Sequence, residues 1–170
     1  MEQTIASMRA YTPALWDNIP DIGLYKDQVL TYIERLYRPL YGENAARLLT
    51  SSMLNNYVKL GVIDRPAGKK YGREQLAALS MLVVLKQATA IDDIARLLNA
   101  QPGDVRSTYE AFCQYLKSAL NSYADMLASS DATALNLAGG ATVSALASER
   151  MLSTESGQQP CAKLKSSKEK

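Results

Sequence analysis

The chain has 170 residues, of which 47% are hydrophobic and 21% charged, and its formal net charge is +2. These values are typical of one soluble globular domain that can bury a core. The absence of histidine and the wide spacing of the two cysteines, Cys113 and Cys161, argue against an enzyme, a metal site or a cofactor. We find neither a signal-peptide pattern nor an apolar run long enough to cross a bilayer, so we expect a cytoplasmic protein without membrane contact.

The charge is unevenly distributed along the chain. Residues 47–73 hold six bases and one acid, a net charge of +5, and the last eight residues carry +3. The remainder of the chain is therefore acidic, with a net charge of −6. Positive charge concentrated in one segment is the electrostatic pattern of a nucleic-acid contact surface, although a merely solvated run of bases would look the same.

The first part of the chain divides into an arm and a helix. Residues 1–20 show no periodicity, and we interpret residues 1–23 as an N-terminal arm that docks through Trp16. Residues 24–37 show apolar side chains at helical spacing, with Pro39 expected to end the helix. Residues 43–49 could add a short turn before the next helix.

The stretch SSMLNNYVKL, residues 51–60, predicts a short helix with one polar face. Thr50 or Ser51 can cap it, and Gly61 is suited to end it. Its polar residues recur at positions i, i+3, i+4 and i+7, which places Ser52, Asn55, Asn56 and Lys59 on one side. Asparagine is a poor helix former, so two adjacent ones on an exposed face suggest a role in binding.

A basic hairpin is expected to follow this helix. Arg65-Pro66-Ala67-Gly68 suits a type I turn, and Val62 and Ile63 could pair with Tyr71. The hairpin would form a small wing over residues 63–71, with Lys69 and Lys70 near its tip and Arg65 across the turn.

Helices are also predicted for most of the second half. Residues 73–87 are apolar nearly all round and indicate a central buried helix, and a capping box at residues 89–92 opens the next one. Residues 104–128 carry a heptad pattern that favours either a dimer interface or packing on the chain's own helices. Residues 132–152 are alanine-rich and interrupted by Gly139-Gly140, which suggests a weak helix pair. Residues 153–170 have the composition of a disordered basic tail.

The segment MLNNYVKLGVIDRPAGKKYGREQLAALSMLVVLKQATAIDDIARLL resembles the DNA-binding head of MerR-type regulators. Leu54, Tyr57, Gly61 and Tyr71 occupy places that match the family's pattern, whereas Asn55 and Asn56 stand where it usually has Arg and Tyr. The chain is still more similar to an uncharacterised bacterial domain-of-unknown-function family, number 1836. That family's motifs are Leu-Tyr-x-Asp-Gln, Met-x-Asn-Asn-Tyr-Val-Lys and Lys-Lys-Tyr, and the similarity covers roughly residues 20–100.

These resemblances imply a mainly α fold. We expect a MerR-like winged helix-turn-helix over residues 24–100 with a small β-hairpin wing, followed by a long C-terminal helix in a possible dimerisation region, residues 101–152. The expected function is sequence-specific transcriptional regulation by a homodimer on double-stranded DNA, nucleoid-associated when bound. A helix-turn-helix that has become a protein-interaction module is the alternative. The candidate DNA-binding residues are Ser51, Ser52, Asn55, Asn56, Tyr57, Lys59, Arg65, Lys69, Lys70 and Arg73, with Tyr57 and Tyr71 leaning towards the core.

Overall fold

The computed structural model describes residues 1–101, 103–129 and 133–155, with the backbone alone for 152–155. It is mainly helical, and 73% of it lies in helices. No helix within these residues is long and apolar enough to cross a membrane. The α-helices are α1 (Glu2–Ala10), α2 (Lys26–Tyr41), α3 (Ser51–Lys59), α4 (Arg73–Leu85), α5 (Ile91–Ala100), α6 (Val105–Ala128) and α7 (Ala134–Glu155). Two short 3-10 helices, η1 (Trp16–Asn18) and η2 (Gly42–Arg47), lie in the connections, and β1 (Leu24–Tyr25) and β2 (Lys70–Tyr71) form a small sheet.

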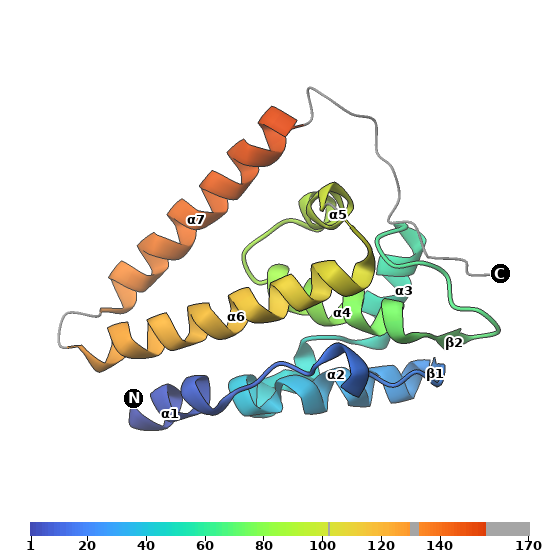
Figure 1. Ribbon diagram of the computed structural model, residues 1–170, viewed down its shortest axis with the longest axis horizontal. Coiled ribbons are helices and arrows are strands. Elements are labelled where there is room, and N and C mark those ends of the chain that lie inside the picture. Colours follow the sequence, from blue (N-terminus) through green and yellow to red (C-terminus); the bar gives the residue numbers. More distant parts are fainter. Residues whose placement is uncertain (102, 130–132, 156–170) are drawn as a thin grey trace.

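Helix α4 is the centre of the core, as its all-round apolar sequence predicts. Seven of its thirteen side chains are buried, among them Leu76, Leu79 and Leu82 with no exposed surface. In Figure 1, α1 and α2 lie on one side of the molecule, and α6 runs over them across α4. Helix α7 stands away from this body and approaches it at α5.

The wing is built differently from the expected local hairpin. Strand β2 pairs antiparallel with β1, with Tyr71 opposite Leu24, instead of pairing with Val62 and Ile63. The N–H groups of Val62 and Ile63 both donate to the Tyr57 carbonyl, at 3.0 and 3.2 Å, which folds the chain back onto the end of α3. The predicted hairpin is therefore wrong, because these two residues complete the helix terminus and have no free N–H groups for a strand ladder.

The turn of the wing also lies further along the chain than predicted. Gly68 and Lys69 adopt φ values of +55° and +68°, and the Lys70 N–H donates to the Ala67 carbonyl at 3.0 Å. Two successive left-handed residues replace the type I turn expected at residues 65–68. Lysine rarely adopts this conformation, so Lys69 carries backbone strain.

The N-terminal arm contains a helix that the sequence did not suggest. Helix α1 packs along α6, where Arg9 pairs with Asp125 at 2.8 Å and Lys117 donates to the Arg9 and Tyr11 carbonyls at 2.7 and 2.6 Å. Trp16, as predicted, docks in the arm that follows and lies partly buried against the core.

Several helix boundaries differ from the predictions. Helix α2 continues past Pro39 to Tyr41, since a proline in the last turn removes one hydrogen bond without ending the helix. The N-cap of α5 is Ala90 and no side chain caps it, so the capping box predicted at residues 89–92 does not form. Helix α7 runs unbroken through Gly139-Gly140 and is one helix rather than a pair. The predicted tail lies outside the described residues from 156 onward.

The first half of the α6 heptad pattern packs in the chain's own core. The residues of this pattern are Val105, Tyr109, Phe112, Leu116, Ala119, Tyr123 and Met126. Val105 and Tyr109 are buried, and Phe112 and Leu116 pack against the core. The second half of the pattern is more exposed to solvent, and its last two residues, Tyr123 and Met126, are 39% and 47% exposed.

Candidate nucleic-acid interface

Helix α3 presents its polar residues together on the surface. Leu54 has no exposed surface and Tyr57 is buried, so this side of the helix is anchored in the core. The Thr50 hydroxyl accepts from the Met53 N–H at 3.3 Å, and Gly61 follows the helix with φ +73°. Both ends are therefore where the sequence predicts them. Opposite the anchor, one row of side chains is exposed to solvent, formed by Ser52, Asn55, Asn56 and Lys59.

Lys86, at the end of α4, helps to hold the start of α3. Its ammonium group donates to the Leu48 carbonyl and lies 3.5 Å from the Met53 sulfur. Burial lowers the pKa of Lys86 below its usual value. Sequence reasoning did not single out this residue, because its partner lies 38 positions away and nothing in the local pattern marks it.

The wing segment, residues 63–71, is held at its base by Gln75 of α4. The Gln75 amide donates to the Asp64 carbonyl at 2.7 Å and accepts from the Gly72 N–H, also at 2.7 Å. One side chain therefore joins the two ends of the segment. Its basic side chains, Arg65, Lys69 and Lys70, are all exposed.

The small sheet adds an exposed aromatic residue beside the wing. The Lys70 ammonium lies 5.1 Å from the centre of the Tyr25 ring, and Tyr25 is 52% exposed. Gly23 must be a glycine here, because a Cβ would come within 2.8 Å of the Lys70 Cβ. The apolar spacing of residues 24–37 predicts that Tyr25 lies on the apolar face of a helix. The structure places it instead in β1 at the surface, because β1 pairs with β2 and sets Tyr25 opposite Lys70.

Three of the candidate DNA-binding residues, Tyr57, Arg73 and Ser51, do not belong to the exposed row of α3. Tyr57 is buried, and desolvation raises the pKa of its phenol, which fits the structural role towards which its sequence position leaned. The Arg73 guanidinium donates to the Ile19 carbonyl at 3.0 Å and stands over the Trp16 ring, so it secures the N-terminal arm. Ser51 is half-buried at the first position of α3.

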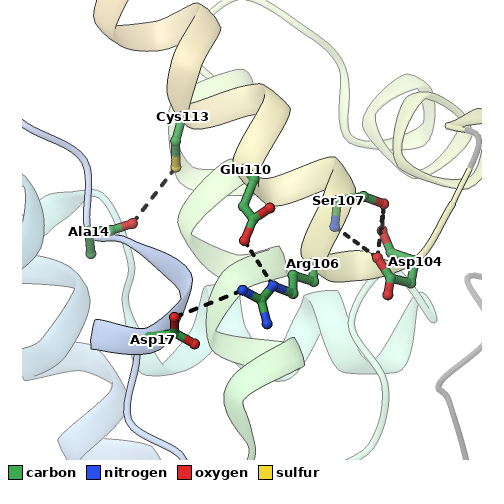
Figure 2. A network of polar contacts seen from close by, with 7 residues as sticks. All are labelled: Ala14, Asp17, Asp104, Arg106, Ser107, Glu110 and Cys113. Atoms are coloured by element: carbon green, nitrogen blue, oxygen red, sulfur yellow. Dashed lines mark hydrogen bonds and ion pairs between the residues drawn. The ribbon is translucent and has the colours of Figure 1, made fainter.

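A second polar network braces the start of α6 (Figure 2). Arg106 bonds Glu110 at 2.8 Å and lies 3.8 Å from Asp17, and Asp104 caps the helix by accepting from the Ser107 N–H at 2.8 Å. The Cys113 thiol approaches the Ala14 carbonyl at 3.9 Å, and its pKa is raised, mainly by burial. The Arg106–Asp17 and Cys113–Ala14 contacts join the arm to α6. A raised pKa keeps the Cys113 thiol protonated, and a protonated thiol is a poor nucleophile. The described residues contain no cluster of three potential metal ligands.

Comparison with known proteins places the chain in a family. The model of the family "Domain of unknown function (DUF1836)" matches residues 14–123. The chain belongs to this family. The match includes α2 to α5 and most of α6, whereas α1 and α7 lie outside it. No curated protein and no solved structure matches the chain.

Proposed function

We propose that this DUF1836 protein is a sequence-specific regulator of transcription that binds double-stranded DNA through a MerR-like winged helix-turn-helix. The observation that carries the proposal is the exposed row of Ser52, Asn55, Asn56 and Lys59 on a helix anchored by Leu54 and Tyr57. Such a helix can enter the major groove without disturbing the core. The protein would act in the cytoplasm, associated with the nucleoid when bound.

In this proposal α3 reads bases and its surroundings hold the backbone. An asparagine amide can pair bidentately with N6 and N7 of adenine, so Asn55 and Asn56 are the residues for direct readout. Ser51 and Ser52 lie at the helix N-terminus, where free N–H groups and the helix dipole favour phosphate. Arg65, Lys69 and Lys70 would contact the neighbouring backbone.

We propose a second copy of the chain as the protein partner. A nine-residue helix is about 13 Å long and reads only a few base pairs, so a regulator of this size gains specificity as a dimer. The outer face of α6 suits such a contact, because its exposed side chains between Glu110 and Asp125 are uncharged and include Tyr115, 74% exposed, and Tyr123. Tyrosine enrichment and charge depletion are features of interface cores.

The test is selection of bound duplexes from a random DNA pool at near-physiological salt. We expect an enriched motif containing A·T pairs, arranged as a palindrome if two copies bind. Asn55→Ala and Asn56→Ala should change the selected motif, with about 1–3 kcal/mol of discrimination lost for each bidentate contact. Asn44→Ala, at an exposed position of η2 outside every surface proposed for binding, is the matched control. An unchanged motif in both α3 variants would remove the assigned readout.

The wing is tested by salt dependence. Lys69→Ala combined with Lys70→Ala should weaken all DNA sequences alike and reduce the slope of log affinity against log salt by about 2. Arg35→Ala, an exposed base on α2, should leave the slope unchanged. If the wing variant keeps the full slope, these lysines do not contact phosphate.

A protein-interaction module is the second candidate function, favoured by the exposed apolar side chains of α7, including Leu135, Val143 and Leu146. It would become the preferred reading if the random pool yields no enriched motif and all binding disappears as salt rises.

A further inference from the structure

A groove lies away from the α3 surface, where α1 crosses the body of the molecule. Its volume is about 590 Å³, and it is lined by α1, the end of α2, Val84 of α4 and two leucines of α6. These are the elements that lie close together on the lower side of Figure 1. The volume lies within the range of small-molecule binding sites.

The floor of the groove is apolar. It is formed by Met8, Leu40, Val84, Leu116 and Leu120, all of which are only half-buried. Four of them also pack against the main core, which holds the floor in place. Filling the groove with a hydrocarbon chain would complete the burial of these side chains, worth about 25 cal/mol for each Å² removed from water.

The lining of the groove also includes residues with hydrogen-bond donors. They are Gln3, Thr4 and Ser7 of α1, which have an amide and two hydroxyls, and Arg38 of α2, which has a guanidinium. Gln3 and Thr4 lie in the first turn of α1, where the helix dipole adds positive potential. The lining of the groove therefore combines apolar side chains with hydrogen-bond donors, a combination that suits an amphipathic molecule.

Arg38 selects the charge of that molecule. Its guanidinium bonds Glu34 at 2.6 Å and Glu43 at 3.3 Å, and the Glu43 side chain is 91% exposed. The Arg38–Glu43 ion pair is long and exposed, so it contributes little to stability. An incoming carboxylate can therefore replace Glu43. Glu34 and Glu43 together would repel a ligand of higher negative charge, such as a polyphosphate.

We propose that this groove binds a small amphipathic monocarboxylate, with its hydrocarbon chain on the apolar floor and its carboxylate at Arg38 and the α1 hydroxyls. Nothing in this inference depends on DNA binding, because the groove shares no residue with the α3 row or the wing segment. The ligand would stabilise α1 against the body, since α1 supplies the donors and part of the floor.

The chain's methionines allow a direct test with decanoate as the probe. The full-length protein is labelled with ¹³C at the methionine methyl groups and titrated below the concentration at which decanoate forms micelles. We expect a saturable shift of the Met8 signal, assigned by its loss in Met8→Leu. Met126 and Met151, 47% and 64% exposed on α6 and α7, are internal controls for non-specific adsorption and should not shift with it.

Two variants separate carboxylate recognition from general apolar binding. Arg38→Gln should weaken decanoate about two- to fivefold, as expected for an exposed ion pair, and leave decanol unaffected, and Ser7→Glu should weaken decanoate by repulsion without altering the floor. Arg35→Gln, on the same helix but outside the groove, is the matched control. Equal shifts at Met8, Met126 and Met151, no shift at Met8, or decanoate affinity unchanged in both variants would overturn the proposal.

Discussion

Helices α3 and α7 are both largely exposed, yet they expose opposite kinds of side chain. The shorter helix, α3, buries Leu54 and Tyr57 and exposes asparagine, serine and lysine. The longer one, α7, has no fully buried side chain among those described and exposes Leu135 at 80%, Val143 at 66% and Leu146 at 54%.

The two helices are kept in place in different ways. A polar face loses nothing in water, so α3 can remain anchored by its core side while its outer row stays available for a ligand. An alanine-rich helix without a buried face gains little from its own chain, because most helical stability in proteins comes from packing. The chain's own packing therefore holds α7 less firmly than it holds α3.

The largest expected change in the free energy of unfolding comes from the tyrosines of the main core, which have no counterpart among the described residues of α7. Burial is the main cause that raises the pKa of the Tyr11, Tyr32, Tyr37 and Tyr109 phenols, and that of Tyr32 rises to about 12. The pKa of each phenol is higher in the folded state than the value near 10 in the unfolded state. The contribution of these phenols to the free energy of unfolding is therefore fully present below pH 10, and it is lost as the pH rises through their folded pKa values. We expect the free energy of unfolding, measured by urea titration followed by circular dichroism, to fall steeply from pH 10 to 12. A value that stays constant over that range would contradict the burial of these phenols.

The next effect compares equivalent truncations in the two helices. Leu54→Ala removes a side chain with no exposed surface and should lower the free energy of unfolding by about 2–5 kcal/mol. Leu146→Ala, at a position 54% exposed, should change it by less than about 0.5 kcal/mol. The measurement is urea unfolding of both variants at low protein concentration. A large loss for Leu146→Ala would show that α7 is already anchored.

Replacing the two glycines of α7 tests whether their low helix propensity limits the stability of this helix. A Cβ at Gly139 or Gly140 would meet nothing within 4 Å. Replacing both with alanine should stabilise the local helix by about 1 kcal/mol per site and slow its amide hydrogen exchange. The unfolding midpoint of the body should stay the same. If that midpoint rises together with the protection of the α7 amides, α7 folds as one unit with α3 and the core.

The smallest effect separates strain from binding in the wing. Lys69→Gly should raise the free energy of unfolding by about 0.5–1 kcal/mol, since glycine adopts the observed φ of +68° without steric cost. It should also remove one phosphate contact from the proposed DNA complex. Lys70→Gly is the matched control, because Lys70 lies in β2 and glycine weakens strands. Loss of stability in Lys69→Gly would show that the lysine side chain, rather than its backbone, supports the turn.

Local patterns predicted much of the helical framework. The ends of α3 follow from capping residues and the buried character of α4 from apolar composition, and the structure confirms both. Helix α6, expected over residues 104–128, runs from Val105 to Ala128. The exposed row on α3 follows from the same spacing. The polar face could be derived in this way because a helix places its side chains by a period that the sequence displays directly.

The features that escaped prediction depend on contacts between distant residues. Tyr71 pairs with Leu24 across 47 positions, Lys86 reaches Leu48, and the carbonyls of Arg9 and Tyr11 bind Lys117 of α6. Helix α1 has little apolar periodicity, so its helical form rests on the surface it covers.

Local sequence patterns predict α2 to α6 and the apolar side of α3, because both follow from residues three and four positions apart. Three other features depend on long-range packing: the strand that pairs with Lys70, the part of the α6 seam that is buried in the chain's own core, and the groove beside α1. These outcomes compare the free energies of alternative long-range packings, and no local pattern in the chain records that comparison.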